Sequence, residues 1–241
     1  MKNYALIFAG GTGQRMNTKS LPKQFLIVHG KPIIVHTVLH FQNCNQIDGI
    51  VVVCIKEYIE YMQKLVSEYN LNKVVSVVEG GNSGQASIFN GLKKLASLYG
   101  ENNEDIVLIH DGVRPLIDEQ LITDNIKCTK KNGNAISASK AIETIITTDN
   151  GNITAIENRS SCYYAKAPQS FYLKDVYECH LQAIKEGKLD FIDSASMARY
   201  YGLNLNIVQC SSENIKITTP MDFYLFKAIL DARENAQIKV L

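Results

Sequence analysis

A glycine-rich turn followed by two basic residues stands near the start of the chain. Arg15 and Lys23 come soon after the segment Ala9-Gly10-Gly11-Thr12-Gly13, which ends an apolar run. Glycines let a backbone approach a ligand closely and turn its N–H groups toward an anion. A guanidinium and an ammonium then add positive charge and further hydrogen-bond donors. This combination favours the binding of a nucleoside triphosphate.

Two better-known phosphate-binding motifs are incomplete in this segment. Met16 stands where the dinucleotide fingerprint G-x-G-x-x-G needs its last glycine, and the Gly-Lys-Ser/Thr of a P-loop is missing. A nicotinamide-dependent oxidoreductase is one alternative, although the acidic residue that it requires at the end of the second strand is not in register. A second alternative is a nucleotidyltransferase that uses UTP, GTP or ATP, and a third is a non-catalytic binding module. A glycosyltransferase is disfavoured, because the chain has no Asp-x-Asp motif.

The elements that must position these residues alternate between strand and helix. Short apolar runs rich in β-branched residues predict strands buried on both faces at 4–9, 49–55, 73–78 and 105–110. Apolar residues at helical spacing predict helices between them, one with Ile59, Met62, Val66 and Tyr69, another with Ile88, Leu92, Leu95 and Tyr99. This alternation predicts an α/β fold with a Rossmann-like, mostly parallel sheet flanked by helices. Ligands of such sheets bind beyond the carboxyl ends of the strands.

Two further segments complete the predicted fold. Runs at 141–148 and 152–156 flank Asp149-Asn150-Gly151, which is a strong hairpin-turn signal. We interpret about 134–166 as a β-arm inserted into a single domain that spans 1–241. The chain closes with a strand at 205–208 and a helix capped by Thr219 and begun by Pro220.

Composition excludes several classes of protein. The 241 residues are 46% hydrophobic and 20% charged, which is typical of a globular protein. Lys+Arg 25 against Asp+Glu 24 gives a net charge of +1, so no nucleic-acid partner is expected. No apolar run is long enough to span a membrane, and no signal peptide is evident, which indicates a cytoplasmic protein. The six cysteines lack metal-ligand spacing and are interpreted as free thiols of a reducing compartment.

The chain resembles the sugar-phosphate cytidylyltransferases, which act on 2-C-methylerythritol 4-phosphate or on ribitol 5-phosphate. The resemblance begins with A-G-G-T-G-x-R-M and L-P-K-Q-F, the segments that carry Arg15 and Lys23. Further motifs follow in the order of the family: Glu79-Gly80-Gly81 with Ser87, His110-Asp111-Gly112-Val113-Arg114-Pro115, Glu143-Thr144, Asn158-Arg159, Ala167-Pro168-Gln169 and Asn214-Ile215-Lys216-Ile217-Thr218. It therefore runs through the whole chain.

The resemblance implies roles for particular residues. It predicts Arg15, Lys23 and Lys216 as catalytic cations, with Lys216 reaching the α-phosphate of CTP. The predicted nucleotide-binding residues are Ala9, Gly10, Gly11, Thr12, Gly13, Gly80, Gly81, Ser87, Asp111 and Gly112. The predicted acceptor-binding residues are Arg114, Thr144, Arg159, Gln169 and Asp193. Mg²⁺ is expected to be held mainly by phosphates, with Asp111 as its protein ligand, although Asp111 has the alternative role of an ion-pair partner for Arg114.

The resemblance also implies a reaction and a partner. CMP passes from CTP to a polyol phosphate with release of pyrophosphate, and the expected acceptor is D-ribitol 5-phosphate, for a cell-wall or polysaccharide precursor. The alternative acceptor is 2-C-methyl-D-erythritol 4-phosphate, for isoprenoid biosynthesis. Val113 and the segments 169–171 and 217–220 are closer to the ribitol branch. Asn82-Ser83-Gly84-Gln85 and Ile192-Asp193-Ser194 depart from the family pattern. A homodimer joined through the β-arms is expected, with Arg159 entering the pocket of the partner.

Overall fold

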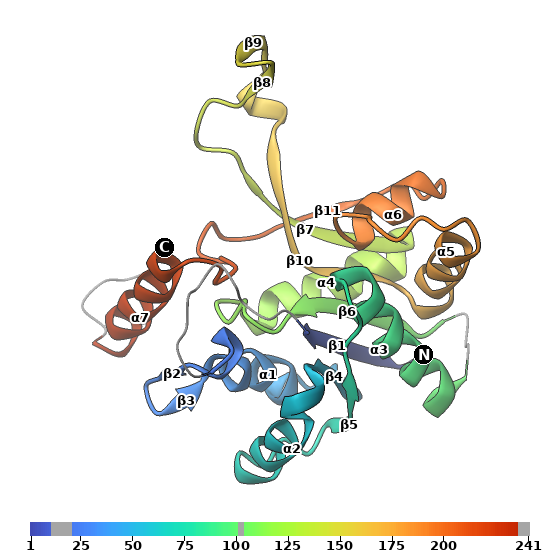
Figure 1. Ribbon diagram of the computed structural model, residues 1–241, viewed down its shortest axis with the longest axis vertical. Helices are drawn as coiled ribbons and strands as arrows, with labels where there is room; N and C mark the ends of the chain where they lie inside the picture. The colour runs from blue at the N-terminus through green and yellow to red at the C-terminus, as the bar shows by residue number, and fades with distance from the viewer. Residues whose placement is uncertain (11–20, 101–103, 236–241) are drawn as a thin grey trace.

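The computed structural model describes residues 1–10, 21–100 and 104–235. In the described part, seven strands form one sheet in the order β11-β7-β10-β6-β1-β4-β5 (Figure 1). Two pairs, β2-β3 and β8-β9, form small separate sheets. Strand bounds are β1 Asn3–Ala9, β2 Ile27–Val28, β3 Lys31–Pro32, β4 Gly49–Cys54, β5 Val74–Glu79, β6 Ile106–Asp111, β7 Asn134–Lys140, β8 Ile146–Asp149, β9 Asn152–Ile156, β10 Tyr163–Tyr172 and β11 Ile207–Gln209.

Helices lie between the strands along the chain. The α-helices are α1 Ile33–Asn43, α2 Ile59–Glu68, α3 Gly84–Tyr99, α4 Glu119–Asn132, α5 Leu173–Lys185, α6 Ser194–Tyr200 and α7 Pro220–Glu234. Three short 3₁₀ segments are η2 Lys23–Phe25, η3 Lys56–Tyr58 and η4 Arg159–Ser161. None of the described helices is both long and apolar enough to cross a membrane.

The central strands pair in parallel, as the sequence predicts. β1 pairs in parallel with β4 and β6, and β4 with β5. Every residue of β4 and of β6 is buried, which explains why these strands are continuous apolar runs rather than alternating ones. β10 runs antiparallel to both of its neighbours, β6 and β7. The sheet is therefore mixed but mostly parallel, and the predicted α/β class is confirmed.

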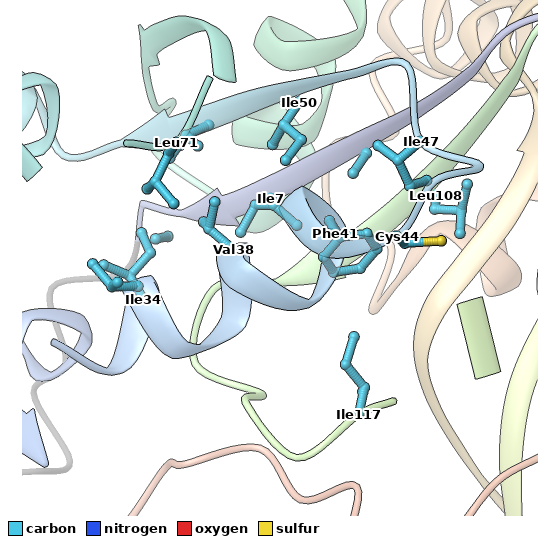
Figure 2. Close-up of a cluster of buried hydrophobic side chains, with 14 of the residues drawn as sticks. Ile7, Ile34, Val38, Phe41, Cys44, Ile47, Ile50, Leu71, Leu108 and Ile117 are labelled. Carbon is cyan, nitrogen blue, oxygen red and sulfur yellow. The ribbon is translucent and has the colours of Figure 1, made fainter. Parts of the chain in front are cut away.

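Hydrophobic clusters cover both faces of the sheet. On one face, α1, α2 and α4 pack over the strands, and Figure 2 shows Val38 and Phe41 of α1 against Ile7 of β1 and Ile50 of β4. On the other face, the cluster joins residues of α3, α5 and α6 to the same strands. A smaller cluster holds Phe226 of α7.

The projecting arm is shorter than the predicted span of 134–166. β7 and most of β10 belong to the seven-stranded sheet, and the segment 141–162 between them carries the small β8-β9 hairpin away from the sheet (Figure 1). The predicted strand at 141–148 forms only over Ile146–Asp149. The predicted turn is confirmed, because Asn150 and Gly151 have φ values of 47° and 81°, as a tight hairpin turn requires.

Other predicted boundaries agree to within two residues or less. Thr219 caps α7, its side chain forms a capping box with Asp222, and Pro220 is the first helical residue. The predicted strand at 205–208 lies at Ile207–Gln209. All six cysteines are free thiols, as expected.

Candidate active site

The carboxyl ends of four parallel strands lie level with one another. Phe8 of β1 is paired with Asp111 of β6, and Ala9 of β1 with Cys54 of β4. Cys54 is in turn paired with Glu79 at the end of β5. The loops that follow these strands therefore meet at one edge of the sheet, where parallel sheets bind ligands.

A pocket of about 720 Å³ opens at this edge, and we call it the nucleotide-side pocket. Eight of the predicted catalytic and nucleotide-binding residues line it: Ala9, Gly10, Lys23, Gly80, Gly81, Ser87, Asp111 and Lys216. Gly11, Thr12, Gly13 and Arg15 lie outside the described residues. Gly112 lines neither this pocket nor the smaller pocket that is described below. Its N–H donates to the carbonyl of Phe8.

Ser87 joins the two glycine segments of this pocket. Its hydroxyl accepts a hydrogen bond from the N–H of Gly81 at 3.0 Å and donates one to the carbonyl of Ser83 at 2.8 Å. A side chain at position 10 would place its Cβ 2.7 Å from this hydroxyl, so the close approach requires Gly10. The predicted glycines thus serve the close packing of two loops around a buried serine.

Asp111 is the centre of a cluster of charges. The Lys216 ammonium lies 2.6 Å from its Oδ1, and the Arg114 Nε donates to Oδ2 at 3.1 Å. Arg114 also donates to the carbonyl of Asn214 at 2.7 Å, which ties the cluster to the segment that carries Lys216. Burial by itself raises the pKa of Asp111, but the two cations outweigh burial and hold this pKa at about 2. Asp111 is therefore an ionised carboxylate that orients two cations.

A second, smaller pocket of about 270 Å³ shares a wall with the first, and we call it the acceptor-side pocket. The predicted acceptor-binding residues Arg114, Gln169 and Asp193 line it. Gln169 donates to Asp193 at 2.8 Å and accepts from the N–H of Ala195 at 2.9 Å. Four residues line both pockets: Phe8, Gly84, Asp111 and Lys216.

Two predicted acceptor-binding residues are not brought to this pocket within one chain. Thr144 and Arg159 belong to the arm and line neither pocket. The guanidinium of Arg159 donates to the carbonyl of Ile142 at 3.3 Å, within the exposed part of the arm.

Several pocket residues were missed from the sequence. Lys166, His180 and Ser194 line the acceptor-side pocket, and Lys56 lines the nucleotide-side pocket. His180 lies on α5 among residues that pack on the sheet, and a single histidine on such a helix gives no sequence signal of a site.

The described residues contain no group of three or more His, Cys, Asp or Glu side chains arranged to hold a metal ion. Among the described residues, Asp111 is the carboxylate that lines both pockets. Carboxylate oxygens are ligands that suit Mg²⁺, which is bound through one or two of them together with phosphates in many phosphate-transferring enzymes. The site therefore fits a metal that phosphates hold for the most part.

The Asp111 cluster predicts a loss of stability when its carboxylate is removed. Asp111→Ala is expected to lower the free energy of unfolding at pH 7 by about 3 kcal/mol, because the buried Arg114 loses its counter-charge. The pKa of Asp111 is depressed, so its contribution is present above about pH 4, near its unfolded pKa, and is lost as the pH falls toward 2. Urea unfolding at pH 7 and pH 3 measures both effects, with Asp190→Ala, at an exposed position, as the control. Equal stability of the Asp111 and Asp190 variants would contradict the prediction.

Comparisons with known proteins identify what this arrangement is. The sequence model of a family described as 2-C-methyl-D-erythritol 4-phosphate cytidylyltransferase (IspD) matches residues 4–232. A protein named ribitol-5-phosphate cytidylyltransferase, from Streptococcus agalactiae serotype III (strain NEM316), is 52% identical over 237 residues and 98% of each chain. A protein named 2-C-methyl-D-erythritol 4-phosphate cytidylyltransferase, from Clostridium acetobutylicum, is 36% identical over 95% of this chain and 97% of its own.

A solved structure is similar over nearly the same length. The crystal structure of 4-diphosphocytidyl-2C-methyl-D-erythritol synthase from Anaerococcus prevotii DSM 20548 superposes with a TM-score of 0.81 at 26% sequence identity. The alignment covers 95% of this chain and 96% of that one. Since the family match, the relatives and the fold agree over almost the whole chain, this chain belongs to the IspD family of cytidylyltransferases, which are nucleotidyltransferases.

Proposed function

We propose that the chain transfers CMP from CTP to D-ribitol 5-phosphate, forming CDP-ribitol and releasing pyrophosphate. The observation that carries this choice of acceptor is the 52% identity, over 98% of both chains, to a relative named for ribitol 5-phosphate. The relative named for 2-C-methyl-D-erythritol 4-phosphate is 36% identical. That acceptor is the second candidate, because the family itself carries its name.

The reaction requires charge neutralisation rather than a nucleophilic side chain. An oxygen of the acceptor phosphate forms a new bond to the α-phosphorus of CTP, and the bond from that phosphorus to the bridging oxygen breaks. Pyrophosphate leaves with the electron pair. The attacking oxygen is ionised at pH 7, because the second pKa of a phosphate monoester is about 6. No general base is needed, and positioning and electrostatic stabilisation supply the catalysis.

The shared wall of the two pockets is where we place this bond change. Lys216 and Asp111 line both pockets, so an ammonium held there reaches a phosphate that arrives from either side. We assign Lys23 and the glycine loops to the phosphates and sugar of CTP, together with Arg15. Arg114, Gln169 and Asp193 are assigned to the acceptor, and Asp111 holds Lys216 in place.

Mg²⁺ is part of the proposal. Asp111 would hold it together with the phosphates of CTP. When bound, Mg²⁺ neutralises charge on the phosphates and favours departure of pyrophosphate.

A homodimer completes the proposed site. Ile142, Ile146, Ile153 and Ile156 of the arm are 46% to 70% exposed. A two-stranded ribbon is only marginally stable, so these side chains require another surface. A partner chain related by a two-fold axis supplies that surface and brings Thr144 and Arg159 to the acceptor pocket of its neighbour. The six free thiols support a reducing, cytoplasmic location.

A screen of pyrophosphate release tests the proposed function. Four nucleoside triphosphates are combined with ribitol 5-phosphate, 2-C-methylerythritol 4-phosphate and other polyol phosphates. We expect CTP with ribitol 5-phosphate to give the highest kcat/KM, by about 10-fold or more, because a site that binds a substrate hydroxyl rejects an acceptor that lacks it. Turnover of 2-C-methylerythritol 4-phosphate without turnover of ribitol 5-phosphate would overturn the acceptor. A preference for UTP or ATP would overturn the nucleotide.

A further inference from the structure

Two buried polar side chains of the acceptor-side pocket lack hydrogen-bond partners. His180 of α5 is 1% exposed, and neither of its ring nitrogens has a partner among the described residues. Ser194, the first residue of α6, is 3% exposed, and its hydroxyl oxygen also lacks a partner there. Both residues line the acceptor-side pocket, and neither lines the nucleotide-side pocket.

Packing by itself does not account for the imidazole of His180. Its ring stacks on Phe89 at 5.9 Å between ring centres, a contact that a phenylalanine would make equally well. Burial lowers the pKa of His180 to about 4, so the ring is neutral at pH 7 and carries one N–H donor and one nitrogen acceptor. Leaving both unpaired in a buried place destabilises the free protein.

Other polar side chains of this pocket already have partners. Gln169 is bonded to Asp193 and to the N–H of Ala195. Arg114 is bonded to Asp111 and to the carbonyl of Asn214. The Lys166 ammonium donates to the carbonyls of Ser211 and Ser212 at 3.4 and 3.0 Å. Unlike these side chains, His180 and Ser194 have hydrogen-bonding capacity that the described residues leave unused.

We propose that His180 and Ser194 bind the hydroxyl groups of the acceptor's carbon chain and thereby select a long polyol phosphate over a shorter one. This inference rests on the proposed function, which places the acceptor phosphate at the wall formed by Asp111 and Lys216. The carbon chain then extends into the part of the pocket that is lined by His180 and Ser194. A hydroxyl both donates and accepts, which matches a neutral imidazole and a serine.

The proposed contacts require local rotations, because the polar atoms of His180 and Ser194 are buried in the free protein. The torsion of an imidazole about its Cβ–Cγ bond is broad, so an arriving hydroxyl can turn a ring nitrogen toward the pocket. The hydroxyl hydrogen of a serine likewise rotates to suit its partner.

The test compares two acceptors in two variants. His180→Phe keeps the stacked ring and removes both nitrogens, and Ser194→Ala removes the hydroxyl. The kcat/KM for ribitol 5-phosphate is divided by that for erythritol 4-phosphate, which is one carbon and one hydroxyl shorter. This ratio is expected to fall about 10-fold in His180→Phe and about 3-fold in Ser194→Ala, as expected for the loss of one or two neutral hydrogen bonds. The KM for CTP should not change.

Melting temperatures separate this role from a structural one. Free His180→Phe should melt at the temperature of the wild type or above it, because an apolar aromatic ring replaces unpaired polar atoms. The matched controls are His40→Phe and Ser137→Ala. The His40 side chain is bonded to the Pro115 carbonyl, and the Ser137 hydroxyl is bonded to Asn125. Neither residue lines either pocket. Each control should lower the melting temperature by about 2–4 °C and leave the acceptor ratio unchanged.

Failure of the proposed function and failure of this inference give different results. If the wild type turns over 2-C-methylerythritol 4-phosphate or erythritol 4-phosphate but not ribitol 5-phosphate, the proposed acceptor is wrong, and so is the preference for the longer chain. An unchanged ratio in both variants, or equal losses for the long and the short acceptor, overturns the inference. If His180→Phe does not fold, the ratio for Ser194→Ala decides.

Discussion

Replacing Lys216 by alanine is expected to lower kcat by about 10²- to 10³-fold, because one preorganised charge contact to the transferring phosphate is lost. Lys216 lines both pockets, and its ammonium is held 2.6 Å from the Asp111 carboxylate. The contact is strongest with charge that develops in the transition state, so kcat and kcat/KM should fall together. Pyrophosphate release at saturating CTP and acceptor measures the loss.

Two further variants control for effects on folding and on charge. Lys227→Ala removes an exposed lysine of α7 that lines neither pocket, and it should keep the kcat of the wild type. Lys216→Arg keeps the positive charge with a different geometry and should recover part of the lost rate. Near-normal turnover of a folded Lys216→Ala protein at saturating substrates would show that this lysine does not stabilise the transferring phosphate.

The central sheet could be predicted because its strands are buried on both faces. Such strands are continuous apolar runs, and the predicted strand at 49–55 agrees with Gly49–Cys54 to within one residue. The capped start of α7 was also predictable, because capping is decided by local side-chain chemistry at Thr219 and Asp222. The sequence carries these features within a few consecutive residues.

The division of the site into two pockets could not be predicted in the same way. Its shared wall joins residues that are remote in sequence, such as Asp111 and Lys216, and the contact depends on how β6 and the segment before α7 pack. The antiparallel direction of β10 likewise follows from the connection that the arm makes between β7 and β10. Asp111 pairs with Arg114, which is the alternative role that the sequence left open, and with Lys216 as well.

The turn of the β-arm was predicted correctly, but the predicted span of the arm, about 134–166, is too long. The turn at Asn150-Gly151 is encoded by two residues that accept positive φ values. The limits of the arm depend instead on whether the flanking strands pair with the main sheet, which β7 and β10 do. Thr144 and Arg159 consequently lie on the segment 141–162, which projects from the sheet (Figure 1), and line neither pocket of their own chain.

Mixing two inactive variants is expected to restore activity if the proposed dimer is correct. Arg159→Ala removes a contact to the acceptor phosphate that the proposed site receives from the partner, and Lys216→Ala removes a contact from the chain's own pocket. In a mixed dimer, one of the two sites has both residues intact. Random exchange makes half of the dimers mixed, so about one quarter of the wild-type activity should return.

A matched pair of variants shows whether the recovery comes from shared sites. Lys23 and Lys216 line the same nucleotide-side pocket of one chain. Mixing Lys23→Ala with Lys216→Ala therefore leaves every site of a mixed dimer with one defect and should restore no activity at CTP concentrations below KM. Exchange of subunits is verified in both experiments with two chains of different mass.

Failure of the Arg159 and Lys216 pair to recover, despite proven exchange, would mean that each acceptor pocket is built from one chain. That outcome would require a change of conformation, because Arg159 is bonded to the carbonyl of Ile142 on the arm and lines neither the nucleotide-side nor the acceptor-side pocket of its own chain. The arm would have to fold back toward the sheet to deliver the guanidinium. Such a movement would also carry the exposed Ile142, Ile153 and Ile156 away from the partner surface of the proposed dimer, so another surface would have to cover them.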